Sequence, residues 1–230
     1  MINSPFLQMP HKADFTYYLS HINTRNKKSI HPFITEKLKG LHKKIYYLNL
    51  LIQSLEVSDK EHTYLQEITV DLITSMDLFS LNYIKSVRMS LRAAIEEFNR
   101  LLLVNIKGEL GKISVYQLNQ QVKDHFQSNT VIKDKVSQML SDYKDLCDFV
   151  HVSGKKAFTE KLVLEDFQII DKSELDRVCN QIFRVIENII FIVICVYKEA
   201  FLKLNKHKQS YILGQMKDLY QKDIEGILEK

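Results

Sequence analysis

MLSDYKDLCDFVHVSG, residues 139–154, has the spacing of an amphipathic helix that ends in a histidine. Its apolar residues recur at three- and four-residue steps, which places them on one face of a helix. The members of this stripe are Met139, Tyr143, Leu146, Cys147 and Val150. Ser153 and Gly154 then favour a stop. The sequence therefore predicts a helix that begins near Thr130 and carries a polar group at its C-terminal end.

The rest of the chain indicates an all-α protein. All three prolines lie in the first 32 of the 230 residues, and six glycines are spread over the whole length. A long proline-free sequence with apolar periodicity is typical of helices, and this length suffices to bury a core. We expect an irregular N-terminal arm at residues 1–32 and a single helical domain at residues 33–230.

The expected helices follow from apolar periodicity and from capping residues. Ser58 and Ser114 are predicted N-caps, Gly108 is a predicted stop, and Ser173 with Glu174 is predicted to open the last core helix. The predicted ranges are 33–55, 60–76, 81–107, 114–126, 173–205 and 209–229.

The segment 189–197, IIFIVICVY, is too short to span a membrane, so we interpret it as part of the most buried helix. The three cysteines are few and widely spaced, which predicts buried reduced thiols in a cytoplasmic protein.

Charge is unevenly distributed along the chain. Residues 1–44 carry a net charge of +6, whereas the whole chain carries +4, so the remainder is slightly acidic. Such a segment could attract nucleic acid or an acidic partner, and it could equally be a solvated basic face. The basic residues predicted to bind RNA or a partner are Arg25, Lys27, Lys28, Lys43 and Lys44.

Lys144 and His151 are the candidate chemical groups of the 139–154 helix. They lie seven residues apart, about two helical turns, and therefore project from one side, with Asp148 between them. A histidine at a helix C-terminus is favoured by the helix dipole, which alone could explain its presence. The functional interpretation is a general acid–base histidine with a cation that steadies a phosphate. The sequence contains no glycine-rich phosphate loop and no HExxH motif.

Arg88, Arg92 and Glu96 recur at four-residue steps along the flank of the 81–107 stripe. One interpretation is an ion-pair rim over the core, in which Arg92 pairs with Glu96. The other is that Arg88 or Arg92 lines a polar cleft that faces another helix.

Two segments resemble the HEPN superfamily of helical proteins: SVRMSLRAAIEEFNR at 86–100 and YKDLCDFVHVSG at 143–154, followed by a long apolar helix. The resemblance covers roughly residues 82–205. It implies a four- or five-helix up-down bundle that forms a homodimer. Many members are metal-independent ribonucleases of bacterial toxin, abortive-infection and antiphage systems, which need no cofactor.

The family motif is an arginine, four to six residues, then a histidine. His151 fits the histidine, Lys144 takes the arginine position without its bidentate fork, and Val150 replaces a polar residue.

Two hypotheses follow. In the first, the chain is a ribonuclease in which His151, Lys144 and either Arg88 or Arg92 are catalytic. Glu96, Asp148 and Ser153 support that site. In the second, the chain is a non-catalytic helical module that binds RNA or a partner protein of the same defence system through its basic segment.

Overall fold

The computed structural model describes residues 11–26, 30–150 and 170–228. These residues contain ten helices, joined by turns and loops, and no strand. The helices are α1 (His11–Asn26), α2 (Pro32–Ser54), α3 (Asp59–Ser80), α4 (Ile84–Lys107), α5 (Val115–Phe126), α6 (Ile132–Val150), α7 (Lys172–Val196), α8 (Lys198–Leu202), α9 (Lys206–Leu213) and α10 (Asp218–Leu228). The prediction of an all-α helical bundle is confirmed.

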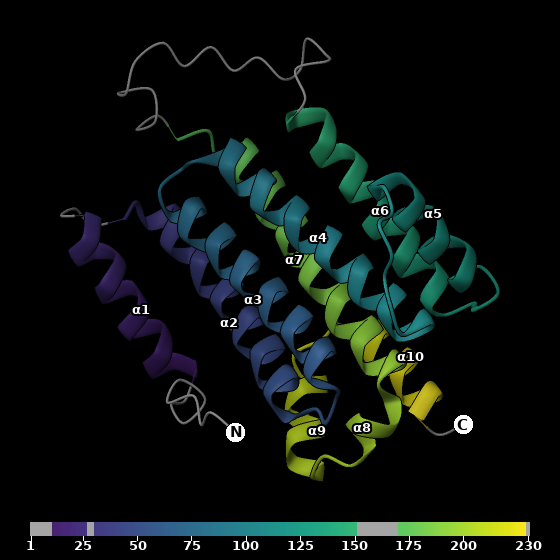
Figure 1. The fold of residues 1–230 in the computed structure, drawn as a ribbon. Coiled ribbons are helices and arrows are strands. Elements are labelled where there is room, and N and C mark those ends of the chain that lie inside the picture. Colours follow the sequence, from purple (N-terminus) through teal and green to yellow (C-terminus); the bar gives the residue numbers. More distant parts are fainter. Residues whose placement is uncertain (1–10, 27–29, 151–169, 229–230) are drawn as a thin grey trace.

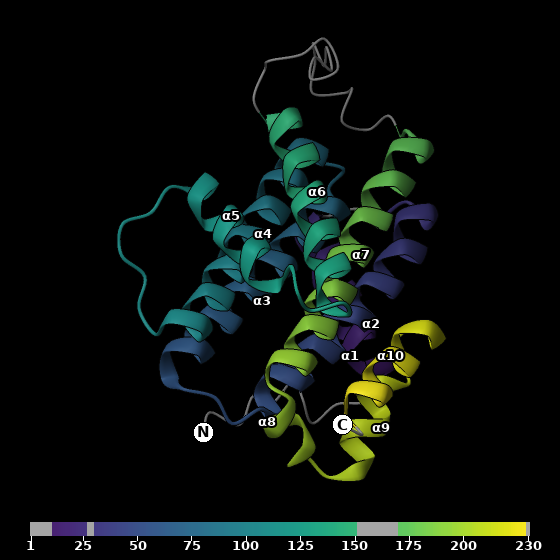
Figure 2. The same cartoon turned by 90° about the vertical axis from the view of Figure 1, so that its right-hand side faces the viewer.

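The long helices α2, α3, α4 and α7 form the centre of the bundle (Figure 1). Helices α5 and α6 pack on α4 at one side, and α1 packs on α2 at the opposite side. The short helices α8, α9 and α10 gather at one end (Figure 2). Buried apolar side chains from Ile34 to Ile224 form one connected core.

Helix α7 is the most deeply buried element, as its composition predicts. Every residue from Val185 to Ile194 is buried. Among the described residues, α7 is the one helix that is long and apolar enough to cross a membrane, and most of it is covered by the rest of the bundle.

Local capping signals are confirmed at three helix ends. Ser58 and Ser114 each form a capping box, with Glu61 and Gln117 respectively, at the beginnings of α3 and α5. Gly108 ends α4 with a φ of 79°, a left-handed conformation that favours glycine.

Glu61 also connects three helix ends. Its Oε2 accepts hydrogen bonds from Ser58, and its Oε1 accepts from Asn105 Nδ2 at 3.0 Å and from Tyr197 Oη at 2.9 Å. Burial by itself raises the pKa of Glu61, but these hydrogen bonds outweigh it and the pKa is lowered. One carboxylate therefore joins the beginning of α3 to the ends of α4 and α7.

The predicted irregular arm is wrong for residues 11–26, which form α1. Pro10 and Pro32 lie outside this helix, so prolines bracket it rather than interrupt it. Its apolar stripe is short: Ile22 is buried and Phe15 is half-buried against α2. So short a stripe gives a weak periodic signal.

The predicted helices 173–205 and 209–229 are each divided. Helix α7 ends at Val196. The next residue, Tyr197, has a φ of −103° and a ψ of 36°, outside the helical region, and α8 follows. The last segment forms α9 and α10 with Gly214 after α9. The predicted opening at Ser173 is also corrected, because Asp171 accepts the Glu174 N–H at 3.0 Å and is the N-cap of α7.

Candidate functional site

The outward side of α6 carries the two predicted site residues that the structure describes there. Lys144 and Asp148 are both exposed, and within the described residues neither makes an ion pair. His151 and Ser153 lie outside the described residues. The acid–base role of His151 therefore stays a prediction, and Lys144 is an accessible cation.

Arg88 holds the last turn of α6 against the bundle. The Arg88 side chain is buried, its Nη2 donates to Glu174 Oε1 at 3.0 Å, and its guanidinium lies 3.8 Å from the centre of the Phe149 ring. Arg177 of α7 lies 5.3 Å from the same ring. Burial lowers the pKa of Arg88, while the Glu174 carboxylate opposes this change.

Arg92 contacts α6 one helical turn further along α4. Its Nε donates to the Tyr143 hydroxyl at 3.3 Å, and this hydrogen bond raises the pKa of Arg92. The predicted pairing of Arg92 with Glu96 does not form, because Glu96 accepts from Arg100 at 2.8 Å. Both arginines thus face α6, and both contact side chains of the bundle itself.

The predicted basic binding residues divide into three groups. Arg25 and Lys43 are exposed, and Lys27 and Lys28 lie outside the described residues. Lys44 is instead half-buried: its ammonium lies 2.9 Å from Glu187 Oε1 and also donates to the Gln215 carbonyl. The prediction that Lys44 belongs to a binding surface is corrected, because a buried carboxylate of α7 already holds it.

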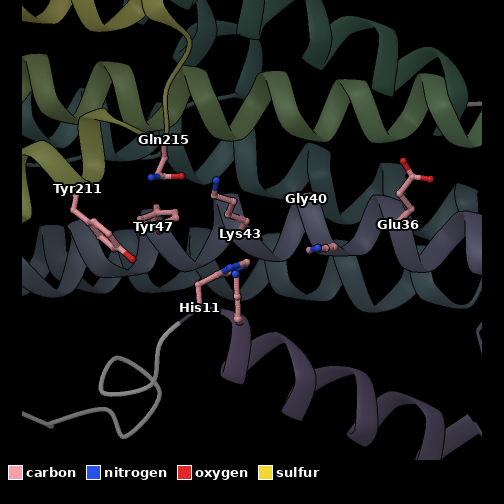
Figure 3. A pocket seen from close by; sticks show the side chains of 9 residues that line it. His11, Glu36, Gly40, Lys43, Tyr47, Tyr211 and Gln215 are labelled. Carbon is pink, nitrogen blue, oxygen red and sulfur yellow. The ribbon is translucent and has the colours of Figure 1, made fainter.

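The sequence did not predict a cleft of about 590 Å³ between α1, α2 and α9. Figure 3 shows His11 of α1 on one side, Lys43 and Tyr47 along α2, and Tyr211 and Gln215 on the opposite side. The lining residues are His11, Lys12, Glu36, Lys39, Gly40, Lys43, Tyr47, Tyr211 and Gln215. Three lysines and one glutamate give the cleft a net positive charge.

A histidine pair joins the wall of this cleft to the core: His11 lines the cleft and is half-buried, and His42 is buried behind it. The rings of His11 and His42 are 5.3 Å apart, and His42 Nε2 lies 3.1 Å from Asp14 Oδ2. Burial lowers the pKa of His42 to about 4, and repulsion from His11 adds to this effect. Burial also lowers the pKa of His11, with further contributions from Lys43, Lys39 and Lys12.

One signal for the cleft was present in the sequence. Lys39 and Lys43 are four residues apart and therefore share one face of α2. Tyr211 and Gln215 come from the other end of the chain, so no local pattern could place them there. In the described ranges, no group of three or more His, Cys, Asp or Glu side chains is arranged to hold a metal ion.

Comparison of the sequence with protein-family models, and of the chain with curated proteins and solved structures, finds no significant match.

Proposed function

We propose that this chain is a HEPN-like protein that acts on RNA in a bacterial defence or toxin-type system, as a cytoplasmic homodimer. The observation that supports the proposal is the construction of α6. Its last turn is fixed at Phe149 between Arg88 and Arg177, while Lys144 is exposed on the outward side two turns before His151. An accessible cation on a fixed helix suits the binding of an RNA phosphate beside an acid–base group.

In this mechanism His151 takes the proton of a ribose 2′-hydroxyl, whose oxygen attacks the adjacent phosphorus. The bond to the 5′-oxygen breaks, and that oxygen receives a proton, leaving a 2′,3′-cyclic phosphate. Lys144 stabilises the negative charge that develops on the phosphoryl oxygens. Arg88 and Arg92 are positioning residues, because both guanidinium groups contact side chains of the bundle. Arg88 contacts Glu174 and Phe149, and Arg92 donates to Tyr143.

Incubation of the purified protein with total RNA in EDTA tests this function. We expect cleavage by the wild type and none by His151→Ala. Lys144→Ala should slow cleavage by about 10²-fold, the usual effect of losing one charge-stabilising group, and Lys144→Arg should retain activity. Lys133→Ala is the matched control, since Lys133 is exposed in the first turn of the same helix. Cleavage that is unchanged in His151→Ala contradicts the mechanism.

A second candidate function is RNA or partner binding without catalysis. It is favoured by the burial of Arg88, which leaves Lys144 as the exposed cation of this part of α6, and by the exposed basic residue Arg25 at the end of α1.

Salt-dependent RNA binding by an Arg25/Lys27/Lys28→Glu variant tests this second function. We expect weaker binding and a smaller slope of log K against log salt than in the wild type. A Lys85/Lys112/Lys133→Glu variant, which changes three exposed lysines elsewhere, is the control. Lys44 is left unchanged because it pairs with Glu187. Equal salt slopes for the two variants would argue against the basic segment.

A further inference from the structure

The cleft between α1, α2 and α9 is lined by lysines that have no carboxylate partner among the described residues. Lys12, Lys39 and Lys43 line it, all three side chains are exposed, and none makes an ion pair or side-chain hydrogen bond within the described residues. Elsewhere, by contrast, the neighbouring lysines of α2 are paired: Lys37 with Asp176 at 2.6 Å and Lys44 with Glu187 at 2.9 Å. The three cleft lysines are therefore available to an anion.

These lysines line one cleft from two helices. Lys39 and Lys43 lie one turn apart on α2, and Lys12 is next to His11 at the beginning of α1. Their charges all contribute to the lowered pKa of the His11 imidazole, which lies in the wall of the same cleft. The first turn of α1 adds the positive end of a helix dipole, which favours a negative charge there.

Two hydrogen-bonding atoms of the cleft residues are also unsatisfied. Within the described residues, His11 Nε2 and Gln215 Oε1 are buried and have no hydrogen-bond partner. Buried polar atoms are usually paired, and a buried atom that lacks a partner costs about 1–3 kcal/mol. Both residues line the cleft, so its walls contain polar groups that the described part of the fold leaves unpaired.

The remaining wall is aromatic. The rings of Tyr47 and Tyr211 meet edge to face at 5.2 Å, and Tyr211 keeps half of its surface exposed. Figure 3 shows both tyrosines at the end of the cleft away from Glu36. An exposed ring face favours a planar organic group, and a volume of about 590 Å³ is in the range of small-molecule sites.

We propose that this cleft binds a small phosphate monoester, with the phosphate between Lys12, Lys39 and Lys43 and the planar organic part against the exposed Tyr211, which packs on the buried Tyr47. A dianionic phosphate offers the charge and the acceptor oxygens that three ammonium groups can use. The site lies on the opposite side of the bundle from α6 (Figure 1), so it is independent of the proposed RNA chemistry. The same group can come from a free ester or from a 5′-phosphorylated RNA end.

Isothermal titration calorimetry at fixed ionic strength tests the site, with phenyl phosphate, inorganic phosphate and phenol as probes. We expect phenyl phosphate to bind with a Kd at least about 10-fold below those of the two others, because it alone uses both parts of the cleft. Lys39→Gln/Lys43→Gln should raise that Kd at least about 10-fold. Tyr211→Ala should weaken phenyl phosphate without changing inorganic phosphate.

The control variant is Lys85→Gln/Lys112→Gln, which removes two exposed lysines far from the cleft in sequence. It should bind phenyl phosphate as the wild type does, and thermal unfolding should show that all variants remain folded. RNA oligonucleotides with a 5′-phosphate or a 5′-hydroxyl distinguish the two sources of the phosphate. Absence of saturable phenyl phosphate binding, or equal losses in the two lysine variants, overturns the proposal.

Discussion

His42 shows how the fold changes the chemistry of a single side chain. It is 7% exposed, its Nε2 lies 3.1 Å from Asp14 Oδ2, and the rings of Phe15 and Tyr18 lie 5.3 and 5.4 Å from its own. Burial of this kind disfavours the charged imidazolium, which is why the pKa falls to about 4. At neutral pH His42 is therefore a neutral donor to the Asp14 carboxyl.

This lowered pKa predicts a loss of stability in mild acid. An unfolded histidine takes up a proton near pH 6.5, whereas folded His42 does so only near pH 4. The contribution of His42 is thus complete above about pH 6.5 and is lost as the pH falls towards 4. Burial raises the pKa of Asp14, which acts in the opposite direction and reduces the net effect.

Urea denaturation between pH 4 and pH 7 measures this effect. We expect the free energy of unfolding of the wild type to fall by roughly 1–2 kcal/mol more than that of His42→Gln over this interval. Glutamine keeps a donor for Asp14 but does not titrate. Parallel pH profiles for the two proteins would contradict the assignment.

At the scale of the helices, Gly40 sets how closely α2 and α7 approach. A Cβ built at Gly40 would lie 2.7 Å from Cζ of Phe183, which is closer than real Cβ atoms come to a neighbour. Glycine within a helix costs roughly 1 kcal/mol relative to alanine, so its presence here is explained by packing.

Gly40→Ala and Gly226→Ala form a matched pair of substitutions. Both glycines lie within helices, but a Cβ at Gly226 meets nothing within 4 Å. We expect Gly226→Ala to stabilise the protein by up to about 1 kcal/mol. Gly40→Ala should be neutral or destabilising by up to about 2 kcal/mol, because overpacking opposes the helical gain.

Thermal and urea unfolding of the two variants check this difference. Gly40→Ala in a Phe183→Leu background is the control, since the shorter side chain removes the clash and should restore the gain. A similar stabilisation by both single substitutions would show that the contact between α2 and α7 accommodates a Cβ at position 40 without overpacking.

For the whole molecule, the all-α class and several helix ends could be predicted from the sequence because their causes are local. Ser58, Ser114 and Gly108 act within one turn of where they stand, so a short window of sequence contains the signal. The hydrogen bond from Tyr197, where α7 gives way to α8, to Glu61 spans 136 residues, and no short window of sequence contains both residues. Helix α1 was missed because its apolar face is short.

The candidate sites follow the same rule. The spacing of Lys144 and His151 could be predicted because both lie in one helix. The pairing of Lys44 with Glu187 and with the Gln215 carbonyl, 171 residues away, depends on how α2, α7 and the end of α9 pack. The cleft beside Lys43 could not be predicted for the same reason, since Tyr211 completes its wall from the last quarter of the chain.

The connection that Glu61 makes between α3, α4 and α7 has a consequence for the speed of unfolding. Its partners Asn105 and Tyr197 are 44 and 136 residues away, so these bonds require most of the bundle to be in place and should form after the folding barrier. Contacts that are absent from the transition state slow the unfolding of the native protein but do not speed its folding. Glu61→Ala should then raise the unfolding rate roughly 10-fold while the folding rate hardly changes.

Stopped-flow chevron plots measure both rates. Gln117→Ala, which loses only the local hydrogen bonds that Gln117 Oε1 accepts from Ser114 at the beginning of α5, should raise the unfolding rate much less. If Glu61→Ala slowed folding instead, the contacts of Glu61 with the ends of α4 and α7 would already be formed in the folding transition state. With the expected result, the lifetime of the folded chain depends in large part on one carboxylate that, besides capping α3, joins the ends of α4 and α7 to it.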